Sequence, residues 1–235
     1  MKIFSSNKII ALCVIGLISA CSDNNNDNTT QAMAKYQIKV YNLTANQPLT
    51  PVAVITHESG FKAWQLGMSA STGLEKLAES GDNSDFLNTS KTDTMVTATA
   101  SGSGAITPGN SETISISSTE KNDLQISIAS MLANTNDAFT GVANWDVGSL
   151  AVNESTMMLT RVFDAGTEKN TEMAGTIPGP ADGGTGYDAT RDDLVDKVLI
   201  SPGVVTSDDG LSTSVLNESH RWLEYAAKVV ITRIE

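Results

Sequence analysis

The segment Tyr36–Leu43 reads YQIKVYNL, and its pattern recurs along the chain. Ile38 and Val40 alternate with polar residues, and a period of two is typical of a β-strand with one buried face. Further segments show the same period or a short apolar run, and the last of them, rich in β-branched residues, is expected to pair with the first. They are Thr113–Ser117, Leu124–Ala129, Met157–Phe163 and Lys228–Ile234.

Clusters of Gly, Asn, Asp and Ser separate these segments, for example at residues 99–110, 179–186 and 207–210. Short strands divided by such loops are typical of an antiparallel sandwich. The sequence therefore predicts a mostly β fold, a single antiparallel β-sandwich with one or two short helices in the connections.

One helix is clear from the sequence. Ser71 or Thr72 is a suitable N-cap, and Leu74 and Leu77 lie on one face of the helix that would follow. Gly81 is placed just beyond the expected last turn, where glycine often ends a helix.

The first 21 residues predict where the protein is located. Lys2 and Lys8 flank an apolar run that is too short to span a bilayer, and residues 17–21 (LISAC) resemble a bacterial lipobox. We expect residues 1–20 to be a signal peptide and Cys21 to carry a lipid that anchors the protein to a membrane. Residues 21–34 would form a tether and 35–235 the folded domain. Ser22 favours the outer membrane of the bacterial cell envelope.

Composition narrows the function. The net charge is −12 and the 15 basic residues are scattered, so nucleic acid is not an expected partner. The mature chain would have no free thiol, because Cys13 lies in the signal and Cys21 is lipidated.

The sequence has no His-Glu-x-x-His zinc motif, no Gly-x-Ser-x-Gly elbow and no Walker loop, and it has only two histidines, His57 and His220. A His57–Ser59 pair is conceivable, but a hydrogen-bonded structural histidine is the plainer interpretation. The protein is therefore not expected to be an enzyme.

Three acidic residues follow the ends of apolar strands. Asp137 lies after the strand that ends near Leu132, and Asp164 and Glu168 follow Met157–Phe163. If these strands are neighbours, the carboxylates converge and repel one another unless a cation neutralises them. Calcium, which prefers oxygen ligands, suits such loops. Two ordinary polar turns with solvated acids remain an alternative.

A family resemblance includes these residues. Residues 61–74 (FKAWQLGMSASTGL), followed by Leu77-Ala78-Glu79-Ser80-Gly81, resemble the N-terminal domain of spondins. The Asp137 segment and Phe163–Glu168 are similar to two loops of that domain, and Ala226–Ile234 is similar to its closing strand. The resemblance extends from about Tyr36 to Ile234.

The resemblance implies a C2-like β-sandwich with a calcium ion held by Asp137, Asp164 and Glu168. Glu168 stands where the family often has Asp. It also implies a binding or adhesion role toward an unidentified protein or glycan ligand. The alternative is a purely structural envelope lipoprotein whose calcium only stabilises the fold.

Overall fold

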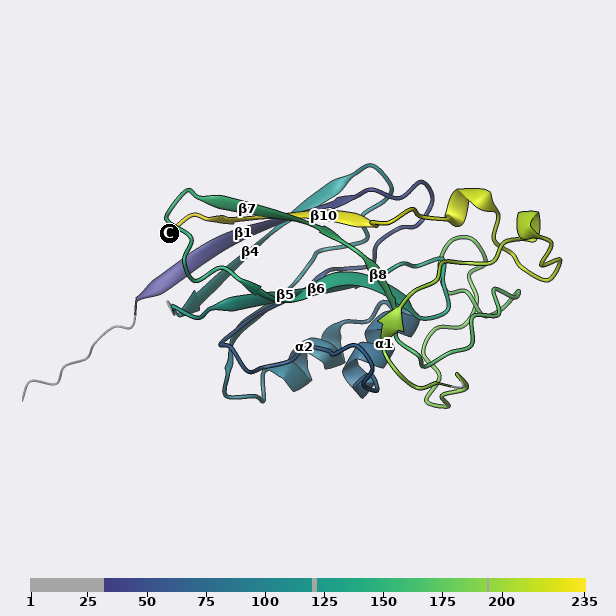
Figure 1. Ribbon diagram of the computed structural model, residues 1–235, viewed down its shortest axis with the longest axis horizontal. Coiled ribbons are helices and arrows are strands. Elements are labelled where there is room, and N and C mark those ends of the chain that lie inside the picture. The colour runs from purple at the N-terminus through teal and green to yellow at the C-terminus, as the bar shows by residue number, and fades with distance from the viewer. Residues whose placement is uncertain (1–31, 120–121, 194) are drawn as a thin grey trace, which may run out of the picture. The chain divides into compact units, whose positions relative to one another are not determined.

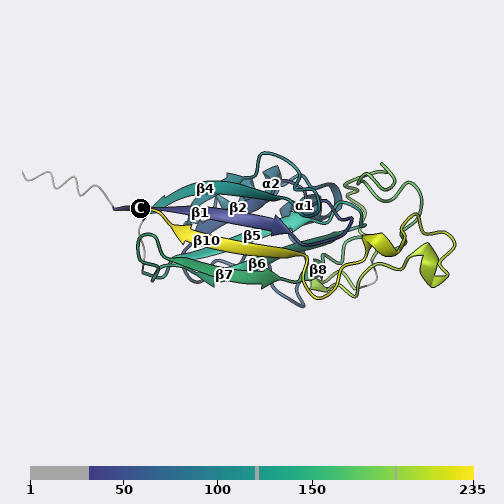
Figure 2. The ribbon, with the colours of Figure 1, turned by 90° about the horizontal axis from the view of Figure 1, so that it is seen from above.

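The computed structural model describes residues 32–119, 122–193 and 195–235, and within them two antiparallel sheets face each other (Figures 1 and 2). This confirms the expected mostly β sandwich. The first sheet has the order β4 (Ser111–Thr119), β1 (Met33–Asn42), β10 (Ala227–Arg233) and β7 (Ser155–Thr160). The second has the order β3 (Val96–Ser101), β2 (Ala53–His57), β5 (Gln125–Met131), β6 (Ala138–Asp146), β8 (Val162–Asp164) and β9 (Leu199–Ile200).

The first and last strands pair as expected. β1 and β10 run antiparallel, with Ile38 opposite Ile231 and Val40 opposite Val229. These side chains are buried because they face the second sheet, where they form the core between the two layers. Alternation of buried and exposed residues along β1 therefore arises from one face in the core and one in solvent.

Two short helices cover the outer face of the second sheet (Figure 1). They are α1 (Thr72–Ser80) and α2 (Ser84–Ser90), and single 3₁₀ turns lie at Ser207–Asp209 and Glu218–His220. Ser71 caps α1 by accepting the Leu74 N–H, and Gly81 ends it in the left-handed conformation, as the sequence predicts. Because β2 lies between the helices and the other sheet, all five of its residues are buried.

The segment predicted as one strand, Met157–Phe163, is divided between the two sheets. β7 pairs with β10 as far as Thr160, and β8 pairs with β6 from Val162 onward. The Thr140 hydroxyl lies at the crossing, 2.8 Å from both the Thr160 hydroxyl and the Arg161 carbonyl oxygen. This change of sheet brings the residues after β8 beside the start of β6.

Buried amides connect the loops at the end of the sandwich to which β1 runs. Gln47 is fully buried, and its side chain donates to the carbonyl oxygens of Asn134 (3.0 Å) and His220 (2.9 Å). Its Oε1 accepts the Asn134 N–H at 3.0 Å. Asn42 similarly donates to the carbonyl oxygens of Gln47 and Ile106. The loop that leads to Asp137 is thus tied to the β1–β2 connection.

We predict that Gln47→Leu lowers the free energy of unfolding by about 3 kcal/mol. The substitution keeps the volume but leaves a buried N–H and two buried carbonyl oxygens unpaired. Urea unfolding measures the effect. Gln37→Leu, on the exposed side of β1, is the control and should change stability by less than about 0.5 kcal/mol. Equal stability of the two variants would contradict this role of Gln47.

Candidate functional site

Asp137 immediately precedes β6 and is fully buried. Its Oδ2 accepts three hydrogen bonds: from the Thr167 N–H at 2.8 Å, the Thr167 hydroxyl at 3.2 Å and the Glu168 N–H at 3.1 Å. Its Oδ1 is buried and has no hydrogen-bond partner among the described residues. One oxygen therefore orders the loop after β8, while the other remains available to a ligand.

Asp164 is the last residue of β8 and lies opposite Ala138 in the ladder with β6. This register places it next to Asp137. Its Oδ1 accepts the Gly166 N–H at 2.8 Å, and its Oδ2 accepts from the Asn170 side chain at 2.7 Å. The strand switch thus brings together two acids that are 27 positions apart in the chain.

Gly166 permits the tight turn that follows Asp164. Its φ of 71° lies in the left-handed region, and a Cβ at this position would lie 2.3 Å from the Lys197 carbonyl oxygen. Only glycine avoids both the strain and the clash.

The surroundings of the three carboxylates raise their pKa values and so favour the protonated, neutral forms. Burial and the neighbouring Asp164 raise the pKa of Asp137 to about 7. Burial, Glu79 and Asp137 raise the pKa of Glu168 to about 8, and burial also raises the pKa of Asp164. The physical cause is the low polarity of the site together with the repulsion of like charges.

The three predicted ligands lie in one region, but they do not form a closed metal cage. Across residues 32–119, 122–193 and 195–235, no three His, Cys, Asp or Glu side chains are already grouped to hold an ion. The kind of donor nevertheless suits a hard cation, because the ligands are carboxylates and Asp137 Oδ1 has no hydrogen-bond partner among the described residues. The Thr167 carbonyl oxygen, in the loop after β8, accepts the Asp192 N–H at 3.1 Å.

Neither histidine forms a catalytic pair with Ser59. His57 is buried with its Nε2 2.8 Å from the Ser127 hydroxyl, and Ser59 instead donates to Asp123. His220 accepts the Asn217 N–H at its Nδ1. Burial lowers the pKa of both rings, which is consistent with structural roles.

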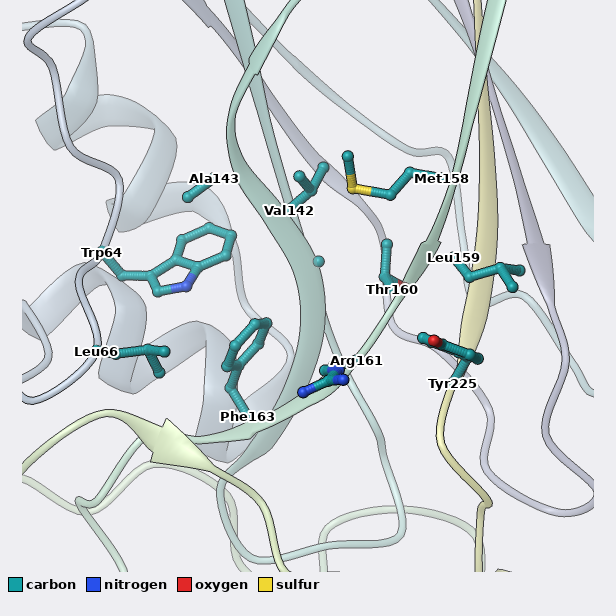
Figure 3. A pocket seen from close by; sticks show the side chains of 11 residues that line it. Trp64, Leu66, Val142, Ala143, Met158, Leu159, Thr160, Arg161, Phe163 and Tyr225 are labelled. Atoms are coloured by element: carbon teal, nitrogen blue, oxygen red, sulfur yellow. The ribbon is translucent and has the colours of Figure 1, made fainter.

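A cleft of about 480 Å³ lies between β6 and β7, where the two strands diverge above Arg161 (Figure 3). Its walls are mainly apolar and include Trp64, Met158 and Phe163. Trp64 packs edge-on against Phe139 and Phe163, at ring distances of 5.3 and 5.9 Å. Because Phe163 directly precedes Asp164, the wall of the cleft is continuous with the carboxylate loop.

Residues 33–177 match the family described as Spondin_N. The chain belongs to the Spondin_N family. The match confirms the resemblance seen in the sequence and includes all three predicted metal ligands, while Ala226–Ile234 lies outside the matched residues. The Spondin_N family is not a known enzyme family. A comparison with curated proteins found no match.

Two acidic residues of this region were not singled out from the sequence as ligands. Glu79, on α1, and Glu172, in the loop after β8, are buried, and each has one oxygen without a hydrogen-bond partner in the described structure. Burial and then Glu79 raise the pKa of Glu168, and burial, with a smaller effect of Asp164, raises that of Glu172. Glu79 could have been suspected, because it belongs to the Ala78–Gly81 motif.

Without metal, the domain should become less stable as the pH rises from 4.5 to about 8. Asp137 and Glu168 have higher pKa values in the folded than in the unfolded state, so the folded state binds more protons over this range. Urea unfolding in chelator at several pH values tests this. The dependence should weaken in Asp137→Asn/Glu168→Gln, and stability that rises with pH in the wild type would contradict it.

Proposed function

We propose that this Spondin_N protein is a lipid-anchored component of the bacterial cell envelope that binds calcium and an extracytoplasmic ligand. The observation that carries the calcium assignment is the bare, fully buried Oδ1 of Asp137 beside two more acids. Asp137, Asp164 and Glu168 would hold the ion. Bound calcium would supply positive charge that cancels the repulsion among these carboxylates.

Burial of the site supports a structural contribution of the ion. Asp137 and Asp164 are both buried, so an ion between them would have little direct access to a ligand. Glu168 is more open and borders a hollow of about 280 Å³. The arrangement therefore favours an ion that orders the loops and leaves contact with a protein or glycan to the surrounding surface.

The cleft in Figure 3 supports a binding role for that surface. An apolar hollow with few polar groups is the usual form of a ligand site. Phe163 connects its wall to Asp164 through a single peptide bond, so an ion that orders the carboxylate loop would also order one wall of the cleft.

Cys21, the proposed site of the lipid anchor, lies outside the described residues. The described chain starts next to β1, which begins at the end of the sandwich opposite β8 (Figure 1). Ten strand residues extend about 33 Å. No helix in the part of the chain that the structure describes is long and apolar enough to cross a membrane.

The second candidate function is purely structural, and the closed surroundings of Asp137 favour it. In that case calcium would replace the stabilisation that disulfides give other extracytoplasmic domains. Ligand binding in the cleft would distinguish the two candidate functions, because a purely structural protein needs no ligand there.

Asp164→Ala should abolish calcium binding to the chelator-stripped fragment 32–235. Wild-type protein should bind one ion in calorimetry and gain about 2.7 kcal/mol of stability at a hundredfold excess of calcium over Kd. Asp146→Ala, at the far end of β6, is the control and should bind as the wild type does. Unchanged affinity in Asp164→Ala would refute the site.

Cys21→Ser should release the full-length protein from bacterial membranes. The sulfur of Cys21 is the atom that would carry the lipid, and the serine side chain has no sulfur. Fractionation followed by a salt wash measures the effect, with Ser22→Ala as the control that keeps the cysteine. If Cys21→Ser stays with the washed membranes, lipid anchoring is wrong.

A further inference from the structure

Glu79 is an acidic residue that is almost completely buried. It lies in the last turns of α1, a helix that packs against β5 and β6, and it is only 1% exposed. A buried carboxylate requires a neutralising partner or several hydrogen bonds, because removal from water penalises its charge. Glu79 has neither in full.

The two oxygens of Glu79 differ in their surroundings. Oε2 accepts the Asp188 N–H at 3.0 Å, whereas Oε1 is buried without a hydrogen-bond partner among the described residues. Burial raises the pKa of Glu79, and Thr167 only partly offsets this, since its hydroxyl donates to Asp137 Oδ2 at 3.2 Å. One hydroxyl has one proton to donate, so it cannot serve both carboxylates at once.

The guanidinium nearest to this part of α1 is already engaged. Arg191 binds Glu75 at 2.7 Å and Asp196 at 2.6 Å, and it also donates to the Ala70 carbonyl oxygen. Its charge is therefore largely shared with residues other than Glu79. Burial, followed by Glu75, raises the pKa of Glu79, and burial together with Glu79 raises the pKa of Glu168 to about 8.

We propose that Glu79 is a fourth carboxylate ligand of the calcium centre, supplied by α1. This inference rests on the proposed calcium function of Asp137, Asp164 and Glu168. It is carried by the buried Oε1, which has no hydrogen-bond partner among the described residues, and by Asp188, which donates to Glu79 and borders the same hollow as Glu168. The ion would then connect α1 to the loops before β6 and after β8, three elements that are distant in sequence.

Calcium titration of Glu79→Gln tests the proposal. The substitution keeps the shape of the side chain and an oxygen for the Asp188 N–H, but it removes the charge. Calcium affinity should fall by about tenfold or more, since affinity follows the number of charged ligands. The melting temperature of the metal-free protein should stay the same or rise, because the loss of one buried acid removes repulsion.

Glu112→Gln is the matched control. Glu112 also has a buried oxygen without a partner in the described residues, but it accepts hydrogen bonds from Ser103 outside the calcium region. The calcium affinity of the Glu112→Gln variant should equal that of the wild type. If Glu79→Gln does not fold, Glu79→Asp replaces it, because the shorter side chain keeps the charge but loses reach, and the same fall in affinity is expected.

The outcomes separate this inference from the function on which it rests. If the wild type binds calcium, Asp164→Ala does not and Glu79→Gln binds within twofold of the wild type, Glu79 is not a ligand and the three-residue site stands. If the wild type binds no calcium, both the site and this inference are wrong. A fall in affinity for Glu79→Gln but not for Glu112→Gln, with intact metal-free stability, supports the assignment.

Discussion

The carboxylate of Asp137 is the interaction on which the functional end of the domain depends. One of its oxygens holds the loop after β8 through Thr167 and Glu168, and the other is buried without a partner in the described structure. The same side chain therefore creates the order of the loop and the electrostatic penalty of the site. A divalent cation is the simplest group that would preserve the order of the loop and remove the electrostatic penalty.

The frame around Asp137 is built from contacts that cross the fold. The change of sheet between β7 and β8 brings Asp164 to the start of β6, and the buried Gln47 amide holds the preceding loop at Asn134. Trp64 packs onto Phe139 and Phe163 on the helical side. The same contacts therefore hold both the carboxylate loops and the cleft of Figure 3. A change in the order of the loops should for this reason also change the order of the cleft wall.

Local patterns predicted much of the architecture but not the route of every strand. β1, β10 and the caps of α1 followed from alternation and from Ser71 and Gly81, because these signals act over a few residues. β2 was missed, since a five-residue strand buried on both faces has no alternation. The division of Met157–Phe163 at Arg161 was missed as well, because a strand that changes partners keeps a strand-like sequence throughout.

The amino-acid sequence by itself determined the β-rich sandwich, the Spondin_N family and the placement of Asp137 and Asp164 after apolar strands. Only the tertiary structure decided that these acids are neighbours, through the pairing of Ala138 with Asp164. It also decided that Glu79 of α1 is buried with one oxygen unpartnered among the described residues. The physical reason is that side-chain periodicity reports which face is buried, whereas proximity between distant residues depends on register and helix docking, which no local pattern encodes.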